Sequence, residues 1–180
     1  MKVNDLRSAL ELLKTIPGQY IETDVEADPN AEISGIYRRV GAHGTCMRPS
    51  PLGPAMMFNK VKGHPDARVA IGVLADRKRV AAMLNTASDK LGFLLKDAVE
   101  KVIAPKVVDS RTAPCHEIVY KATDDGFDIR KLIPAPTNTP EDAGPYITLG
   151  LCYGTDPDTN AKDITIHRLC LQSKDEISMY

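Results

Sequence analysis

The N-terminal part of the chain carries apolar residues at helical spacing. In one stretch the apolar positions i, i+3, i+4 and i+7 are Leu6, Ala9, Leu10 and Leu13. This spacing predicts an amphipathic helix that Asn4 or Asp5 caps and that Pro17-Gly18 ends. Residues 19–25 then alternate between apolar and polar side chains, which predicts a strand with one buried face.

A second helix is predicted after Asp28-Pro29, because Asp is a good N-cap and proline suits the first helical position. Its apolar stripe consists of Ile33, Ile36, Tyr37 and Val40. We expect this helix to end at Gly41. A loop rich in Gly and Pro is expected from residue 41 to residue 54.

Short apolar runs bounded by turn residues predict buried strands at 55–58 and 69–74. Helices are predicted at 77–84 and after a cap at Ser88. The apolar face of the latter helix consists of Leu91, Leu94, Leu95, Ala98 and Val102. Strands and helices alternate without a strict strand–helix–strand repeat, so the pattern favours the α+β class.

The pattern weakens between residues 103 and 114, where we place a domain boundary. The predicted division is an N-terminal α+β domain at 1–110 and a strand-rich domain at 111–180. Strands of the second domain are predicted at 117–121, 146–153, 164–172 and 176–180. We expect them to begin a β-barrel or sandwich whose last strand leaves an edge to be paired.

Composition and charge exclude several classes of protein. The chain has 23 Lys and Arg against 24 Asp and Glu, so no net field draws it to nucleic acid or to an anionic membrane. Arg77, Lys78 and Arg79 form the densest basic run. Because Asp76 and an apolar stretch flank this run, we interpret it as the solvated start of a helix, not a polyanion site.

Targeting signals are also missing from the pattern. No apolar run approaches the roughly 18 residues of a membrane span, and the N-terminus lacks the apolar core of a signal peptide. The four cysteines show no C-x-x-C pair: Cys46, Cys115, Cys152 and Cys170. Widely spaced cysteines are typical of reduced thiols, so we expect a cytoplasmic protein.

The segment 155–168 contains the most suggestive chemistry. Asp156, Asp158 and Asn160 occupy the first three ligand positions of a calcium loop. Ala161 stands where such a loop needs Gly, and His167 where it needs a bidentate Glu. A hairpin loop is therefore the preferred interpretation.

Arg168 lies in an otherwise apolar strand, where a guanidinium is costly unless it meets an anion. The residues alone leave open whether it binds a carboxylate or phosphate ligand or reaches a neighbouring Asp or Glu at the sheet rim. His167, as an isolated histidine, is more typical of a packed or surface residue than of a ligand.

The prolines at 134, 136 and 140 exclude long regular structure in the segment 127–145. Thr139, followed by Pro140, predicts a capped single helical turn that Gly144 ends. The segment either positions the next strand as a rigid loop or forms a wall of a pocket.

Several separated segments, in order, resemble the UbiD family of decarboxylases. They are FDIRKL at 127–132, PTNTP at 136–140, DAGPYIT at 142–148 and DITIHR at 163–168. Upstream segments resemble the branch that acts on protocatechuate and gallate: YIETD at 20–24, DPNAE at 28–32 and GPAMMFN at 53–59. The resemblance covers nearly the whole chain, which matches only the N-terminal portion of the longer family members.

This resemblance implies a reversible, non-oxidative decarboxylation of hydroxybenzoic acids: protocatechuate, gallate or 4-hydroxybenzoate. It implies that residues 111–180 begin a split β-barrel that binds prenylated FMN, which acts as the electron sink. It further implies Mn²⁺ or Mg²⁺ at the flavin phosphate, K⁺ nearby, a flavin prenyltransferase as cofactor supplier, and a homo-oligomer formed through the missing C-terminal part.

The family motif also implies roles for individual residues. Asp163 matches a metal-ligand position, and a hard oxygen ligand suits Mn²⁺ or Mg²⁺. The positions expected to line the flavin are Thr148, Thr165, Ile166, His167 and Arg168. Arg168 matches the essential catalytic Arg of the family, whereas His167 is expected to contribute its backbone.

Asp163 and Arg168 are an odd number of residues apart, so one flat strand would point them to opposite faces. Either Asp163 lies in the loop before the strand, or a bulge redirects Arg168.

The proton-donating Glu and the further metal ligands of the family have no counterpart in this sequence, so we expect no turnover by the chain alone. Two hypotheses stay open: a fragment of a decarboxylase, or a catalytically silent subunit that assembles with or holds the cofactor.

Overall fold

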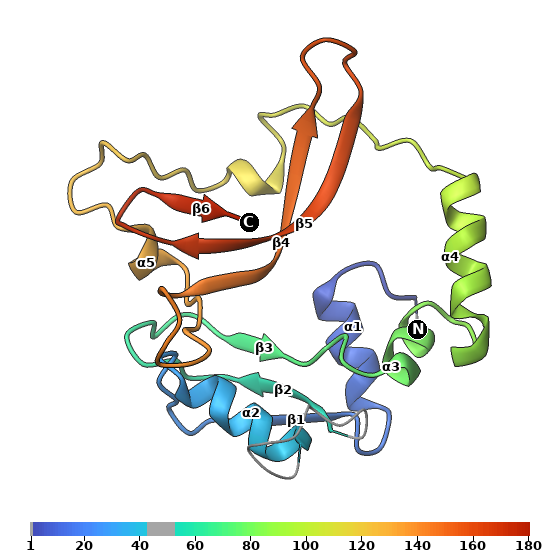
Figure 1. Cartoon of the computed structure of the whole chain (residues 1–180), viewed down its shortest axis with the longest axis horizontal. Helices are drawn as coiled ribbons and strands as arrows, with labels where there is room; N and C mark the ends of the chain where they lie inside the picture. Colours follow the sequence, from blue (N-terminus) through green and yellow to red (C-terminus); the bar gives the residue numbers. More distant parts are fainter. Residues whose placement is uncertain (1, 43–52) are drawn as a thin grey trace.

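A computed structural model describes residues 2–42 and 53–180. The described residues form helices and two small sheets (Figure 1), which confirms the predicted α+β class. The N-terminal sheet has the order β1-β2-β3: β1 (Tyr20–Thr23), β2 (Ala55–Phe58) and β3 (Val69–Ile71). The C-terminal sheet has the order β4-β5-β6: β4 (Tyr146–Thr155), β5 (Lys162–Leu171) and β6 (Ile177–Met179).

The first predicted helix is confirmed as α1 (Leu6–Lys14). Asp5 caps it, since the Asp5 carboxylate accepts the Ser8 N–H at 2.7 Å and the Ser8 hydroxyl accepts the Asp5 N–H at 3.1 Å. This reciprocal pair satisfies two backbone donors that a helix start leaves without intrahelical partners. The helix buries Ala9, Leu10 and Leu13.

The core of the N-terminal half lies between β2 and helix α2 (Glu32–Ala42). Every residue of β2 is buried, because β1 pairs with it on one side in parallel and β3 on the other side antiparallel. The buried cluster consists of Ala27, Ile33, Tyr37, Met56, Phe58 and Val61. Burying one large apolar side chain contributes about 1.5–3 kcal/mol, so this cluster stabilises the packing of α2 on the sheet.

Helix α2 begins at Glu32, so the predicted cap at Asp28-Pro29 is wrong. The Asp28 carboxylate instead accepts the Asn30 N–H at 2.8 Å and pairs with Lys62 at 2.8 Å. Asn30 is diverted from the helix because it pairs with Thr137 of the C-terminal half. The helix includes Gly41, where we expected it to end, and most of the predicted 41–54 loop, with Cys46, lies outside the described residues.

Arg79 is fully buried, so interpreting the whole basic run as solvated was wrong at this residue. Helix α3 (Arg77–Met83) leaves Arg77 exposed but turns the Arg79 guanidinium inward. There it donates to the Gln19 side chain at 2.9 Å and to the backbone oxygens of Gly53 and Gly72 at 2.7 and 3.0 Å. These acceptors flank the ends of three different strands, which the guanidinium therefore ties together.

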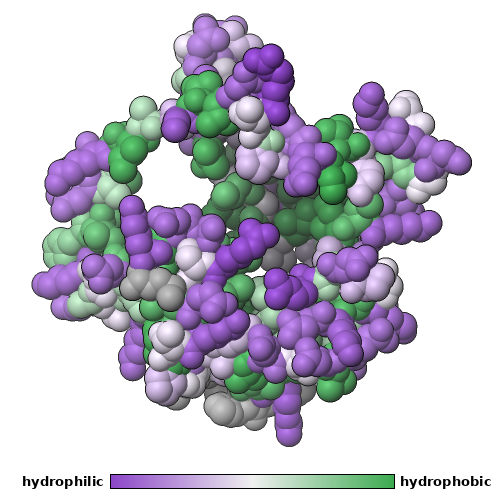
Figure 2. Space-filling model, turned by 180° about the vertical axis from the view of Figure 1, so that it is seen from behind, coloured by the Kyte–Doolittle hydropathy of each residue, from purple (hydrophilic) through white to green (hydrophobic). Residues whose placement is uncertain are grey.

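The last helix of this half is exposed. It comprises η1 (Ser88–Lys90) and α4 (Leu91–Glu100), and Ser88 opens η1 without forming the predicted side-chain cap. Only Leu91 of its predicted apolar face is buried, whereas Leu95 is 56% exposed and Val102, just past the helix, 83%. Figure 2 shows hydrophobic side chains at the surface in several places on the reverse side of the molecule, and an opening through it.

The stretch from residue 101 to residue 128 is irregular apart from η2 (Pro114–His116). The strand predicted at 117–121 does not form, and Ile118, Val119 and Tyr120 are more than half exposed. An alternating apolar pattern needs a partner strand to become a sheet, and the described part of the chain offers none there. No helix among the described residues combines the length and apolar character that a membrane span requires.

The remaining predicted strands are confirmed as β4, β5 and β6. The short α5 (Ile129–Leu132) is the one helix in the proline-rich segment before β4, as far as the structure describes it. A hairpin loop joins β4 to β5, as predicted, and the Asp156 carboxylate holds it by accepting the N–H groups of Asp158 and Thr159 at 2.8 and 3.0 Å.

Replacing Arg79 with Ala should destabilise the chain by about 3 kcal/mol or more, because three buried or partly buried acceptors lose a charged donor and a cavity opens. Arg77 lies two residues earlier in the same helix and is exposed, so Arg77→Ala should change stability by less than about 0.5 kcal/mol. Urea unfolding of both variants measures the difference. Equal midpoints for the two variants would show that Arg79 does not hold the sheet.

Candidate functional site

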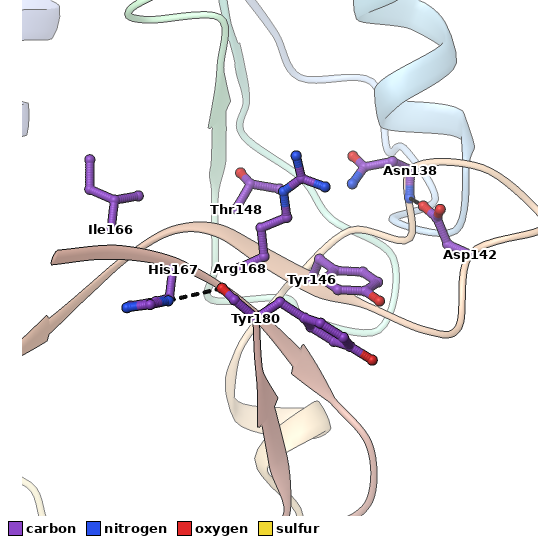
Figure 3. Close-up of a pocket in the computed structure, with 8 residues that line it drawn as sticks. All are labelled: Asn138, Asp142, Tyr146, Thr148, Ile166, His167, Arg168 and Tyr180. Carbon is purple, nitrogen blue, oxygen red and sulfur yellow. Dashed lines mark hydrogen bonds between the residues drawn. The ribbon is translucent and has the colours of Figure 1, made fainter.

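A cavity of about 980 Å³ lies where β4 and β5 meet the loop before β4 (Figure 3). The residues that line it are Asn138, Asp142, Tyr146, Thr148, Ile166, His167, Arg168 and Tyr180. Of the predicted cofactor-binding residues, this set includes Thr148, Ile166, His167 and Arg168. Thr165 and Asp163 lie outside it.

An irregularity in β4 shapes the cavity opposite Arg168. Ile147 pairs with Leu169 and Gly150 pairs with His167, so β4 has one residue more than β5 between these pairs. The extra residue forms a bulge, which increases local twist and changes where side chains point. Glycine at position 150 leaves room beside the bulge, since a Cβ there would overlap the Leu169 side chain unless that side chain moved.

The structure decides between the two explanations of the odd spacing between Asp163 and Arg168. Asp163 lies inside β5, paired with Gly154, so the alternative that placed it in the loop is wrong. A bulge does occur, but on β4 opposite Arg168 and not within β5 itself.

The Arg168 side chain is exposed and points into the cavity (Figure 3). This side chain has no hydrogen bond or ion pair with any residue in the described ranges. The alternative that Arg168 pairs with a nearby Asp or Glu at the sheet rim is therefore not observed among these residues. A guanidinium without an anion offers a planar, bidentate binding site for a carboxylate or phosphate.

His167 is held by the backbone. Its Nδ1 lies 2.9 Å from the Tyr180 carbonyl oxygen, to which an Nδ1–H donates. That bond fixes the imidazole at the edge of the cavity, as the dashed line in Figure 3 shows. The imidazole therefore already has a backbone partner.

Ile166 provides an apolar wall, since its side chain lines the cavity and is 61% exposed. Its partner across the hairpin is Leu151, and the next apolar pair joins Ile164 to Tyr153. All four side chains are more than half exposed. The hairpin thus presents a row of apolar side chains that nothing in the described chain covers.

Tyr146 lines the cavity beneath the loop. Hydrogen bonding with the Cys170 thiol, together with burial, raises the pKa of Tyr146, so the phenol stays protonated at neutral pH. The Tyr146 N–H donates to the Pro136 oxygen at 2.9 Å, which attaches the loop to the start of β4.

The loop before β4 forms one wall of the cavity through Asn138 and Asp142. The predicted helical turn capped by Thr139 is not present: the structure has a non-helical turn closed by the Asp142 N–H on the Thr139 oxygen at 3.1 Å. The Asp142 carboxylate caps it instead, accepting the N–H groups of Asn138 and Thr139 at 3.1 and 3.0 Å. The sequence left open whether this segment is a rigid loop or a pocket wall; two of its residues line the cavity, and no motif singled out Asn138.

Asp163 does not by itself form a metal site. Its carboxylate is exposed and accepts the N–H of the next residue, Ile164, at 2.8 Å. The described residues contain no group of three or more His, Cys, Asp or Glu side chains arranged to hold a metal ion. One oxygen ligand falls short of what Mn²⁺ or Mg²⁺ requires.

The cavity does fit a ligand that combines a flat apolar ring with an anionic group. Arg168 supplies positive charge, Thr148 and Tyr146 supply hydroxyl groups, and Ile166 supplies an apolar surface. Flavin mononucleotide has this combination of a ring system and a phosphate.

Two sequence profiles of one family match the chain. The "3-octaprenyl-4-hydroxybenzoate carboxy-lyase N-terminal domain" of UbiD matches residues 11–99. The "3-octaprenyl-4-hydroxybenzoate carboxy-lyase Rift-related domain" matches residues 106–180. Together they leave only the first ten residues and 100–105 unmatched.

Gallate decarboxylase of Lactiplantibacillus plantarum is 54% identical over 176 residues, which are 98% of this chain and 36% of that protein. A 3,4-dihydroxybenzoic acid decarboxylase of Enterobacter cloacae, solved in its apo form, is 52% identical with a TM-score of 0.91, over 100% of this chain and 37% of that one. The chain therefore spans little more than a third of the length of these relatives.

A more distant structure is that of an evolved dimeric form of the UbiD-class enzyme HmfF of Pelotomaculum thermopropionicum in complex with prFMN. It is 28% identical with a TM-score of 0.81, over 97% of this chain and 38% of that chain.

Proposed function

Because the chain belongs to the UbiD family of carboxy-lyases, we propose that it forms the N-terminal part of a decarboxylase of hydroxylated benzoic acids that uses prenylated FMN. Arg168, unpaired within the described chain and directed into a cavity with an apolar wall, is the observation that carries the proposal. The gallate and 3,4-dihydroxybenzoic acid decarboxylases among the relatives support the substrate class. The neighbour solved with prFMN supports the cofactor.

We propose a domain boundary near residue 110, within the irregular stretch that separates α4 from η2. Residues 111–180 then begin a split β-barrel. The exposed apolar pairs Leu151–Ile166 and Tyr153–Ile164 support this proposal, because a sheet face of this kind is normally covered by further strands or by a ligand.

When bound, the prenylated FMN supplies the electron sink for loss of CO₂. The residues of this chain bind and orient the ligand. The planar guanidinium of Arg168 holds an anionic group, and Ile166 packs against a ring and excludes water from it. Tyr146, protonated at neutral pH, can donate a hydrogen bond through its hydroxyl group. Asp142 contributes the only carboxyl side chain that lines the cavity within the described residues, and its Oδ2 already accepts two backbone N–H groups. We therefore propose that the acid that returns a proton to the ring carbon lies elsewhere.

Asp163 remains a proposed ligand for Mn²⁺ or Mg²⁺. Its one carboxylate oxygen can contribute only if residues outside the described chain supply the others. K⁺, a homo-oligomer, a cytoplasmic location and supply of the cofactor by a flavin prenyltransferase are proposed on the family resemblance.

In the protein that carries this chain at its natural length, Arg168→Ala should abolish turnover of 3,4-dihydroxybenzoate and lower the bound flavin. Arg168→Lys should perform nearly as badly, because an ammonium group replaces a planar fork by a point charge. Arg130→Lys is the control, since Arg130 is occupied by its ion pair with Asp128 at 2.8 Å. Wild-type turnover and flavin content in Arg168→Lys would contradict the assigned role.

Asp163→Ala should lower the bound manganese and flavin together, while Asp163→Asn should retain more of both because an amide oxygen can coordinate. Asp158→Ala, on the loop of the same hairpin, serves as the control. Metal analysis and flavin absorbance of the purified natural-length variants measure the result. Equal, wild-type contents in both Asp163 variants would defeat the ligand assignment.

The 180-residue chain, supplied with prenylated FMN and Mn²⁺, should release no CO₂ from 3,4-dihydroxybenzoate, gallate or 4-hydroxybenzoate. The reason is that the described residues offer one carboxyl side chain at the cavity, Asp142, whose Oδ2 already accepts two backbone N–H groups, and no group of metal ligands. Measurable CO₂ release from the chain alone would refute this expectation.

A further inference from the structure

One side-chain hydrogen bond joins the N-terminal half of the chain to a residue that lines the cavity. The Ser34 hydroxyl, on α2, donates to Oδ1 of Asn138 at 2.8 Å, and Asn138 lines the cavity together with Arg168. The two partners are partly buried and 104 residues apart. The contact is therefore not local to the loop, and it orients the amide of a cavity residue from the N-terminal half.

Backbone pairing reinforces this contact one residue earlier. The Ala31 N–H donates to the Thr137 oxygen at 2.8 Å, and the Thr137 N–H donates to the Pro29 oxygen at 3.1 Å. Ala31 has a φ of 66°, a left-handed conformation that costs a residue with a Cβ roughly 1 kcal/mol or more. Such strain persists only where surrounding contacts fix the backbone, so the position of Thr137–Asn138 is strongly determined.

Two of the polar groups of Asn138 are therefore occupied, and one is left for a ligand. Oδ1 accepts from Ser34, and the backbone N–H donates to the Asp142 carboxylate. The amide nitrogen Nδ2 has no hydrogen-bond partner among residues 2–42 and 53–180. Figure 3 shows the Asn138 side chain turned toward the Arg168 guanidinium and Thr148.

The charges that line the cavity determine which kind of ligand Nδ2 of Asn138 can bind. Arg168 brings a positive charge, and the Asp142 carboxylate is turned to the backbone amides of its own loop. Two donors that point into one cavity, one of them cationic, suit an oxyanion.

We propose that Asn138 is an anion-binding residue of this cavity, donating from Nδ2 to the same oxyanion that Arg168 binds, and that Ser34 is the residue that positions it. This inference rests on the proposed function and extends it. The oxyanion is the carboxylate of the aromatic acid or the phosphate of the flavin. The N-terminal half of the chain thus contributes to ligand binding through α2.

The test uses the natural-length protein with two probes. FMN affinity of the apoprotein is measured by flavin fluorescence, and the KM for 3,4-dihydroxybenzoate is measured on the holoenzyme. Asn138→Ala should weaken one of the two by roughly tenfold, as expected for one hydrogen bond to a charged group. Asn138→Asp should weaken it more, because the acceptor for Ser34 is kept while the donor becomes a negative charge.

Ser34→Ala should produce a smaller loss of the same kind, and Ser34→Ala combined with Asn138→Ala should be no worse than Asn138→Ala alone. Thr139→Ala is the matched control, since only backbone groups of Thr139, its N–H and its oxygen, take part in the loop contacts. Thermal unfolding of every variant separates loss of binding from loss of fold, and Asn138→Asp keeps the test valid if Asn138→Ala unfolds.

A loss of FMN affinity identifies the oxyanion as the phosphate, and a rise in KM alone identifies it as the substrate carboxylate. Either result supports the proposal. Wild-type FMN affinity and KM in Asn138→Asp, in a protein that is otherwise active, would overturn it and leave the proposed function intact. A wild-type protein that neither binds FMN nor decarboxylates would overturn both.

Discussion

The buried guanidinium of Arg79 holds one end of the N-terminal sheet together. Because β1 and β2 are parallel and β3 runs against them, Gln19 and Gly53 precede their strands at the same end where Gly72 follows β3. Arg79 donates to all three, and each of these acceptors would otherwise cost about 1–3 kcal/mol if buried without a partner. Gly72, at a φ of 74°, can present its oxygen there because it has no Cβ to overlap the Tyr37 ring.

The candidate site depends on this sheet through a short series of contacts. β2 packs against α2 through Ile33 and Tyr37, which fixes the helix that carries Ser34. Ser34 then meets Asn138 in the loop before β4, beside Arg168 in the cavity. A change in how α2 packs on its sheet would therefore move a donor in the cavity, although no residue of α2 lines that cavity.

The sequence predicted most elements because spacing of apolar residues depends on local geometry alone. It failed where a distant partner decides: Asp28 pairs with Lys62 instead of capping α2, and Arg79 finds acceptors next to three strands that are far apart in sequence. The family motif led to Thr148, Ile166 and Arg168, which line one cavity. Asn138 could not be assigned from sequence, since its role follows from Ser34, 104 positions away.

The C-terminal hairpin is buried at its base and exposed toward its tip, and this difference bears on the proposed function. Near the base, Gly150, Cys170 and Leu171 are buried and β6 pairs with β5, whereas Leu151 and Ile166 farther along are 73% and 61% exposed. The cavity lies where these two regions meet. A ligand that covers Ile166 and neutralises Arg168 would supply the contacts that the outer hairpin lacks, so ligand binding and hairpin stability are coupled by mass action. The exposed guanidinium and apolar surface of this region thus make the outer hairpin less stable in the free chain than it would be with a ligand bound.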